Sequence, residues 1–89
     1  TFKNFDEVIE RANDNDLGLC SYLYTNSMDK AHIGSEKLET GCVAVNTGVV
    51  ALAEAPFGGI KQTGYGREGG SGAIKDYLNV KYTHMGLKI

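Results

Sequence analysis

Between residues 55 and 68 the chain reads Ala-Pro-Phe-Gly-Gly-Ile-Lys-Gln-Thr-Gly-Tyr-Gly-Arg-Glu. This stretch holds the only proline of the chain and four of its twelve glycines, together with two aromatic and three charged side chains. A helix or strand interior does not tolerate so many glycines, and a flexible linker does not need the bulky and charged residues. The composition predicts an ordered, sharply bent loop that lines a ligand or a neighbouring segment.

The residues at the start of the chain follow a helical and then a strand-like pattern. Apolar side chains recur at the spacing of one helical face, at Phe5, Val8, Ile9 and Ala12. The polar run at residues 13–16 ends this predicted helix. Residues 19–25 are short, apolar and aromatic, which predicts a buried strand.

A second helix is predicted from Met28 to Glu39, with Asn26 or Ser27 as its N-cap and Gly41 as its C-terminal stop. The inner stripe of this helix is thin and consists of Ala31, Ser35 and Leu38. Residues 42–46 are again mostly apolar and predict another strand. Strand, helix and strand with short joints predict a βαβ unit, with a parallel strand pair and a right-handed crossover.

The expected elements become shorter towards the C-terminus. Residues 47–66 show no regular period, and a loop of this length in a compact domain is typical of a functional loop. A last helix is predicted over residues 71–78, with Ser71 as its cap. Residues 79–85 alternate between two faces, which predicts a final strand that either pairs with a partner or stays exposed to solvent.

Residues 56–68 closely resemble the C-terminal signature of the aldehyde dehydrogenase superfamily, which is roughly Pro-Phe-Gly-Gly-x-Lys-x-Ser/Thr-Gly-x-Gly-Arg-Glu. Residues 41–46 resemble the family's Gly-x-Val-x-Val-Asn strand, and residues 77–82 resemble its closing Tyr-x-x-x-Lys strand. The combination of Val-Asn-Thr-Gly with Ala-Pro-Phe-Gly-Gly is similar to the succinate-semialdehyde dehydrogenase-like members. The resemblance spans nearly the whole chain.

The resemblance implies an α/β fold, as the C-terminal fragment of a longer catalytic domain. Residues 1–78 would belong to the nucleophile-bearing domain, and residues 79–89 would form a strand that bridges subunits of a homo-oligomer. The parent protein would oxidise a small aldehyde to a carboxylate with NAD or NADP. The nucleophile, the base and the cofactor fold would lie outside these 89 residues, so this chain alone would bind no cofactor and would be inactive.

The resemblance also assigns roles to residues of the loop. Phe57 would line the aldehyde tunnel, although it would equally serve as an aromatic anchor of the loop. Val50 and Ala51 would lie at the tunnel mouth. Glu68 would pass protons from the catalytic base, or else form a structural ion pair or a helix N-terminal acid. The remaining signature residues would hold the backbone in place, namely Asn46, Pro56, Gly58, Gly59, Lys61, Gly64, Gly66 and Arg67.

Ala51 departs from the succinate-semialdehyde pattern, in which serine helps to bind the remote carboxylate of the substrate. Alanine cannot donate this hydrogen bond, so the substrate of the parent remains open between an acidic and a more apolar aldehyde.

Several other classes of function are disfavoured by composition. The net charge is −2 with interspersed signs, which argues against nucleic-acid binding, and no apolar run reaches the roughly 18 residues of a membrane span. Cys20 and Cys42 are interpreted as buried reduced thiols, which fits a cytoplasmic protein. Residues 64–69 match the dinucleotide pattern G-x-G-x-x-G, but no strand pattern precedes them. The alternative to an enzyme is an interaction or assembly module that lost the chemistry.

Overall fold

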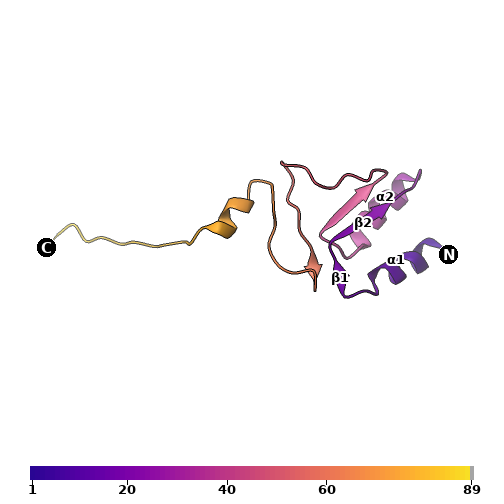
Figure 1. The fold of residues 1–89 in the computed structure, drawn as a ribbon, viewed down its shortest axis with the longest axis horizontal. Coiled ribbons are helices and arrows are strands. Elements are labelled where there is room, and N and C mark those ends of the chain that lie inside the picture. The colour runs from indigo at the N-terminus through magenta and orange to yellow at the C-terminus, as the bar shows by residue number, and fades with distance from the viewer. Residues whose placement is uncertain (89) are drawn as a thin grey trace.

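A computed structural model describes residues 1–88 of the chain. Figure 1 shows a folded body that contains the helices and paired strands, and an extended C-terminal segment that leads away from it. The described part measures 75 × 24 × 19 Å along its principal axes, so the extended segment sets its length. None of its helices is long and apolar enough to cross a bilayer.

Helix α1 (Phe5–Asn13) begins directly after Asn4, which is its N-cap. The Asn4 side chain accepts a hydrogen bond from the Glu7 N–H at 2.9 Å, which satisfies one of the free amides of the first turn. Ile9 is buried with 7% of its surface exposed, and Phe5 and Val8 are half-buried. Ala12, expected on the same apolar face, is exposed.

Strands β2 (Cys20–Leu23) and β3 (Cys42–Val45) pair in parallel, and helix α2 (Met28–Lys37) connects them. The predicted βαβ unit is therefore confirmed in its parallel pairing. Ser27, one of the two expected caps, accepts from the Lys30 N–H at 3.3 Å. Helix α2 lies beside the two strands, and α1 lies next to α2 (Figure 1).

Gly34 is the buried residue of α2, whereas Ser35, expected on the inner stripe, is exposed. A Cβ atom at Gly34 would lie 2.5 Å from the Leu23 side chain. The absent side chain therefore allows α2 to approach β2 closely. Ser35 instead donates its hydroxyl to the Ala31 carbonyl at 2.7 Å, which is a common way for an exposed serine to be satisfied within a helix.

The loop without periodicity contains a short strand that the sequence did not predict. Strand β4 (Ile60–Lys61) pairs antiparallel with β1 (Leu17–Gly18), and Gly18 lies opposite Ile60. Two residues are too few to show an alternating pattern, and the partner lies far away in the sequence. This pairing joins the second half of the chain to the start of the βαβ unit.

The last predicted helix is a 3-10 helix, η1 (Ala73–Tyr77), and Ser71 does not cap it. The capping position is Gly72, and no side chain bonds there. The predicted strand over residues 79–85 is not formed in the described chain, because a strand needs a ladder of hydrogen bonds to a neighbour. These residues are exposed, and residue 89 of the expected bridging segment lies outside the described residues.

Candidate functional site

Phe57 and Glu68 close the glycine-rich loop at its base. The Phe57 N–H donates to the Glu68 carbonyl, and the Glu68 N–H donates to the Phe57 carbonyl, both at 2.7 Å. This reciprocal pair forms an isolated antiparallel bridge. The loop predicted from its composition is thus ordered by its own backbone. The same bridge fixes the backbone positions of the residues that carry the Phe57 ring and the Glu68 carboxylate.

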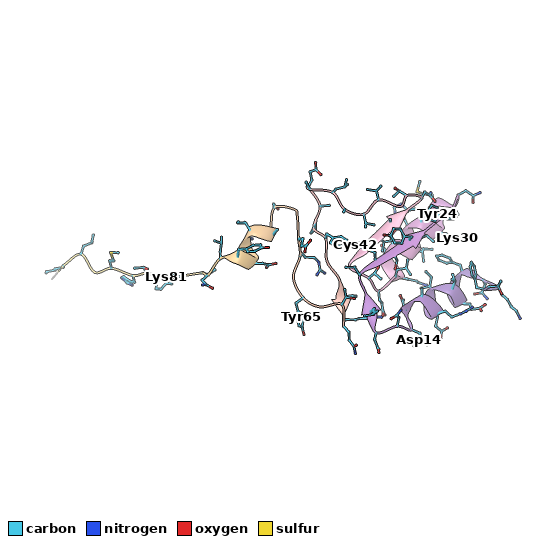
Figure 2. All side chains as sticks on the ribbon, viewed as in Figure 1. Asp14, Tyr24, Lys30, Cys42, Tyr65 and Lys81 are labelled. Atoms are coloured by element: carbon cyan, nitrogen blue, oxygen red, sulfur yellow. The ribbon has the colours of Figure 1, made fainter. Side chains whose placement is uncertain are left out.

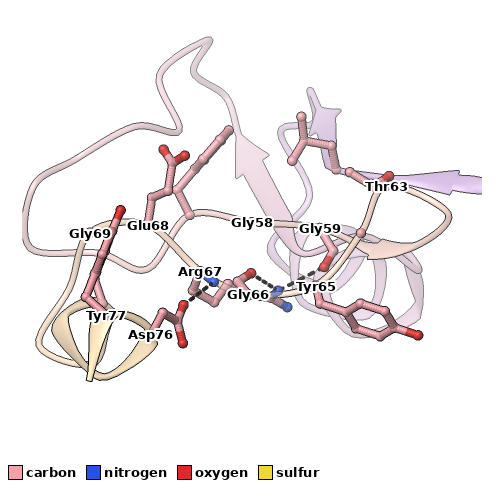
Figure 3. A pocket seen from close by; sticks show the side chains of 14 residues that line it. Gly58, Gly59, Thr63, Tyr65, Gly66, Arg67, Glu68, Gly69, Asp76 and Tyr77 are labelled. Carbon is pink, nitrogen blue, oxygen red and sulfur yellow. Dashed lines mark hydrogen bonds between the residues drawn. The ribbon is translucent and has the colours of Figure 1, made fainter. Parts of the chain in front are cut away.

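Arg67 ties the interior of this loop together, as Figure 3 shows. Its Nη1 atom donates to the Gly59 carbonyl at 2.9 Å and to the Gly66 carbonyl at 2.7 Å. Charged donors make the stronger hydrogen bonds, so one guanidinium fixes two stretches of backbone. The Arg67 N–H also lies 3.4 Å from the Asp76 carboxylate, which connects the loop to η1.

Gly58 lies where two backbone segments come too close for any side chain. A Cβ atom there would lie 2.5 Å from the Gly66 carbonyl oxygen and 2.8 Å from the Arg67 side chain. Gly64 and Gly66 have φ angles of 114° and 86°, a region that side-chain-bearing residues seldom adopt. These glycines are therefore required by the path of the loop.

Lys61 anchors the loop to the end of α1. Its ammonium group donates to the Asn13 carbonyl at 2.9 Å and the Asn15 carbonyl at 3.1 Å, and it forms an ion pair with Glu39 at 2.7 Å. Two carbonyls and one carboxylate occupy the three ammonium donors. This arrangement is that of a structural lysine.

Thr63 and Asp76 make contacts that the sequence pattern did not predict. Thr63 Oγ1 accepts from the Gly18 N–H at 2.7 Å, which holds the loop against β1. Thr63 could have been identified from the loop signature, because it occupies the signature's Ser/Thr position. Asp76 carried no comparable signal, since its contact with Arg67 depends on how the chain folds back after residue 70.

Asn46 follows directly after β3 and has a φ angle of 57°, in the left-handed region. Its side-chain amide pairs with the backbone of Thr25, accepting at 2.8 Å and donating at 2.9 Å. Asparagine adopts this conformation more readily than most residues. Asn46 thus turns the chain out of the sheet while keeping the ends of β2 and β3 together.

Two shallow hollows lie beside the loop. The smaller, of about 310 Å³, is lined by Ala51, Phe57, Glu68 and their neighbours Leu52, Ala53 and Gly69. The other is lined by residues of the loop and of η1, including Phe57 and Glu68 (Figure 3). Three predicted site residues, Ala51, Phe57 and Glu68, therefore come together. Val50 does not line either hollow, and the Glu68 side chain is exposed rather than buried.

Residues 64–69 do not form a dinucleotide-binding turn. Such a turn places the N-terminus of a helix against the pyrophosphate directly after the glycines. Here the segment runs into the bridge between Glu68 and Phe57, and η1 begins only at Ala73 with five residues. The G-x-G-x-x-G match is thus explained by the loop's own geometry.

Cys20 and Cys42 are free thiols that lie opposite each other on neighbouring strands. Both are half-buried, and Figure 2 shows Cys42 at the strand pair. Burial raises the pKa of the Cys20 thiol, and the neighbouring Cys42 sulfur raises it further by charge and by hydrogen bonding.

Residues 1–83 match the sequence pattern of the aldehyde dehydrogenase family, so the chain belongs to this family of oxidoreductases. It is 48% identical to the 3-sulfolactaldehyde dehydrogenase of Pseudomonas putida over 96% of this chain and 18% of that protein. It is 45% identical to the NADP(+) succinate-semialdehyde dehydrogenase of Escherichia coli K12, over 97% of this chain and 18% of the relative.

The fold leads to the same family. The crystal structure of succinate-semialdehyde dehydrogenase from Burkholderia pseudomallei superimposes with a TM-score of 0.82 at 43% identity, over 85% of this chain and 16% of that one. The chain thus spans less than a fifth of the length of these relatives. The resemblance read from the loop signature is confirmed, including its similarity to succinate-semialdehyde dehydrogenases.

Proposed function

We propose that this chain is the C-terminal part of an NAD(P)-dependent aldehyde dehydrogenase that oxidises a semialdehyde, and that residues 51–69 form part of its substrate tunnel. The observation that carries the proposal is the fixed position of Phe57, held by Glu68 in a hollow that also contains Ala51. Relatives named for succinate semialdehyde and 3-sulfolactaldehyde support a short substrate with an acidic far end.

The tunnel wall acts by excluding water and by positioning the aldehyde. An aromatic ring at Phe57 packs against the chain of the substrate and keeps bulk water away from the reacting carbon. The nucleophilic cysteine and the catalytic base are assigned to segments outside these residues. When bound, the nicotinamide supplies the acceptor for the hydride of the aldehyde.

Glu68 is assigned to proton transfer at the outer end of the site. It lies at the base of the loop beside Phe57 and lines both hollows, and its side chain is exposed. A carboxylate in contact with both a tunnel and solvent can carry a proton between them. In this role Glu68 is a proton-relay residue, and the Glu68→Gln variant would lower kcat more than it raises KM.

Residues 79–85 are assigned to a bridging strand that pairs with another subunit in a homo-oligomer. Their exposed side chains include Val80, at 101% relative exposure, and Tyr82, at 84%. The rings of Tyr82 and His84 meet edge to face with centroids 6.5 Å apart, which places alternate residues on one side as in a strand. Backbone of this kind gains hydrogen bonds when it joins a sheet edge.

The proposed function is tested with the protein purified at its natural length from the cytoplasmic fraction, where we expect it. Reduction of NAD or NADP is measured with succinate semialdehyde and with the neutral aldehyde butanal. Phe57→Ala should raise KM for both, because losing the aromatic contact with the substrate costs up to about 3 kcal/mol of binding. Phe2→Ala is the matched control, since Phe2 is an exposed phenylalanine that lines neither hollow.

Absence of dinucleotide reduction with any aldehyde would favour the assembly-module alternative. If Phe57→Ala and Phe2→Ala changed KM equally, Phe57 would not line the substrate tunnel. The proposed aldehyde dehydrogenase activity would still stand.

A further inference from the structure

Cys20 and Cys42 occupy equivalent positions on two adjacent parallel strands. Their Cα atoms are register partners in the β2–β3 pair. Neighbouring strands lie about 4.8 Å apart, and Cα atoms bridged by a disulfide are roughly 4.4–6.8 Å apart. Side chains at paired positions point to the same face of a sheet, so the two sulfur atoms are neighbours.

The face that carries these sulfurs is opposite to the one that α2 covers. The Leu23 side chain points towards Gly34 of α2. Cys20 is three residues before Leu23 on the same strand, so its side chain points to the opposite face. On the cysteine side the Cys42 sulfur lies 3.9 Å from the Gly58 carbonyl oxygen, next to Phe57. The pair therefore lies between the sheet and the base of the glycine-rich loop.

We propose that Cys20 and Cys42 are a redox-sensitive modification site, at which a hydroperoxide converts the two thiols to a cross-strand disulfide. This role goes beyond aldehyde oxidation, which the family assigns to a cysteine outside this chain. The geometry supplies what an isolated thiol lacks, namely a second sulfur in register with the first.

The reaction balances with the hydroperoxide as the only oxidant. The Cys42 thiolate attacks one peroxide oxygen, the O–O bond breaks, and a sulfenic acid results together with an alcohol, or with water when the oxidant is hydrogen peroxide. The Cys20 sulfur then displaces the oxygen from the sulfenic sulfur, the S–S bond forms, and water leaves with the Cys20 proton. The two thiols lose two electrons, and the peroxide gains them.

The order of the two cysteines follows from their environment. Burial raises the pKa of the Cys20 thiol, and the charge and hydrogen bond of the neighbouring Cys42 sulfur raise it further, which disfavours the Cys20 thiolate. The thiolate is the form that attacks peroxide, so Cys42 reacts first and Cys20 resolves the intermediate. Disulfide formation would also change the contact of the Cys42 sulfur with the Gly58 carbonyl, so oxidation would alter the packing at the base of the loop.

The test uses the purified protein at its natural length, treated with hydrogen peroxide, alkylated and digested without reductant. Cleavage after lysine and arginine places Cys20 in residues 12–30 and Cys42 in residues 38–61, each as the single cysteine of its peptide. Mass spectrometry should detect these two peptides joined, lighter by two hydrogen atoms and separable by reductant.

The matched control is the double variant Cys20→Ser/Ser21→Cys, which moves the thiol one residue along the strand and thus to the opposite face. The joined peptides should be lost in this variant. The proposal is overturned if the natural protein yields both peptides only as separate alkylated or over-oxidised species. It is also overturned if the double variant links as readily, or if Cys42 links to a different cysteine instead.

Discussion

The side-chain amide of Asn46 pairs with the backbone of Thr25 as another strand residue would. Its Oδ1 atom accepts from the Thr25 N–H at 2.8 Å, and its Nδ2 atom donates to the Thr25 carbonyl at 2.9 Å. The Asn46 N–H also donates to the Leu23 carbonyl at 2.8 Å. The β2–β3 ladder thus continues for one more step through a side chain, while the backbone already turns away.

Replacing Asn46 by glycine should loosen this junction without straining the backbone. Glycine accepts the positive φ angle, so the loss is that of two hydrogen bonds, each worth about 1 kcal/mol. Local opening at Thr25 should become about 30-fold more frequent, as judged by amide hydrogen exchange. Asn26→Gly, in the exposed turn nearby, should leave exchange at Thr25 nearly unchanged, and equal effects of both variants would contradict the role of Asn46.

Two glycine-to-alanine substitutions should have opposite outcomes. A Cβ atom at Gly41 would overlap the Gly58 carbonyl oxygen, whereas nothing lies within 4 Å of a Cβ atom at Gly48. Gly41→Ala should destabilise by about 1–3 kcal/mol because backbone must move. Gly48→Ala should be neutral or stabilise by up to about 1 kcal/mol, since it restricts the unfolded chain. Thermal unfolding midpoints measure both, and a Gly41→Ala protein as stable as the Gly48→Ala protein would refute the close approach.

Arg67→Lys should weaken substrate positioning although the charge is retained. Both contacts come from the Nη1 atom at the far end of the guanidinium, and the lysine ammonium lies on a shorter, more flexible stem that should not hold both carbonyls at once. Loss of one charged hydrogen bond, worth roughly 1.5–3 kcal/mol, should lower kcat/KM about tenfold or more in the proposed enzyme. Arg11→Lys on exposed α1 makes the same chemical change away from the loop and should keep kcat/KM within twofold or so of the parent value.

Ala51→Ser should shift substrate preference towards acidic aldehydes. A serine hydroxyl in the hollow beside Phe57 can donate to a remote carboxylate, a bond worth roughly 1.5–3 kcal/mol. The ratio of kcat/KM for succinate semialdehyde to that for butanal should rise about 10-fold to 100-fold. Ala55→Ser, in the same loop but not among the residues lining the hollow, serves as the control. A ratio that stays constant in Ala51→Ser would exclude Ala51 from the tunnel mouth.

The Cys20 thiol should make stability depend on alkaline pH. Its pKa is raised in the folded chain, so the folded state holds the proton at pH values where the unfolded chain has released it. Its contribution to stability is therefore complete below the ordinary cysteine pKa of about 8.5 and is lost as the pH rises through the higher folded value. Thermal unfolding from about pH 8 to pH 10 should show a steeper decline for the natural protein than for Cys20→Ser. Parallel pH profiles would contradict this coupling.

Much of the local structure was predictable from short-range signals. The spacing of Phe5, Val8 and Ile9 predicted α1, and Ser27 was one of the two expected caps of α2. Each of these signals acts within a few residues, where propensity and hydrophobic period are informative. The errors at Ala12, Ser35 and Ser71 concern which side of an element is covered or how its first turn is closed, which depends on neighbours distant in sequence.

The amino-acid sequence by itself determined the family, the order α1, β2, α2 and β3 within residues 1–46, and the need for a bent loop at residues 55–68, because these follow from local composition and spacing. Only the tertiary structure decided how the loop is held. Lys61 reaches carbonyls 46 and 48 residues away, Thr63 bonds Gly18 across 45 residues, and β4 finds its partner in β1. Such contacts form when distant backbone groups must satisfy one another, and no local period records them.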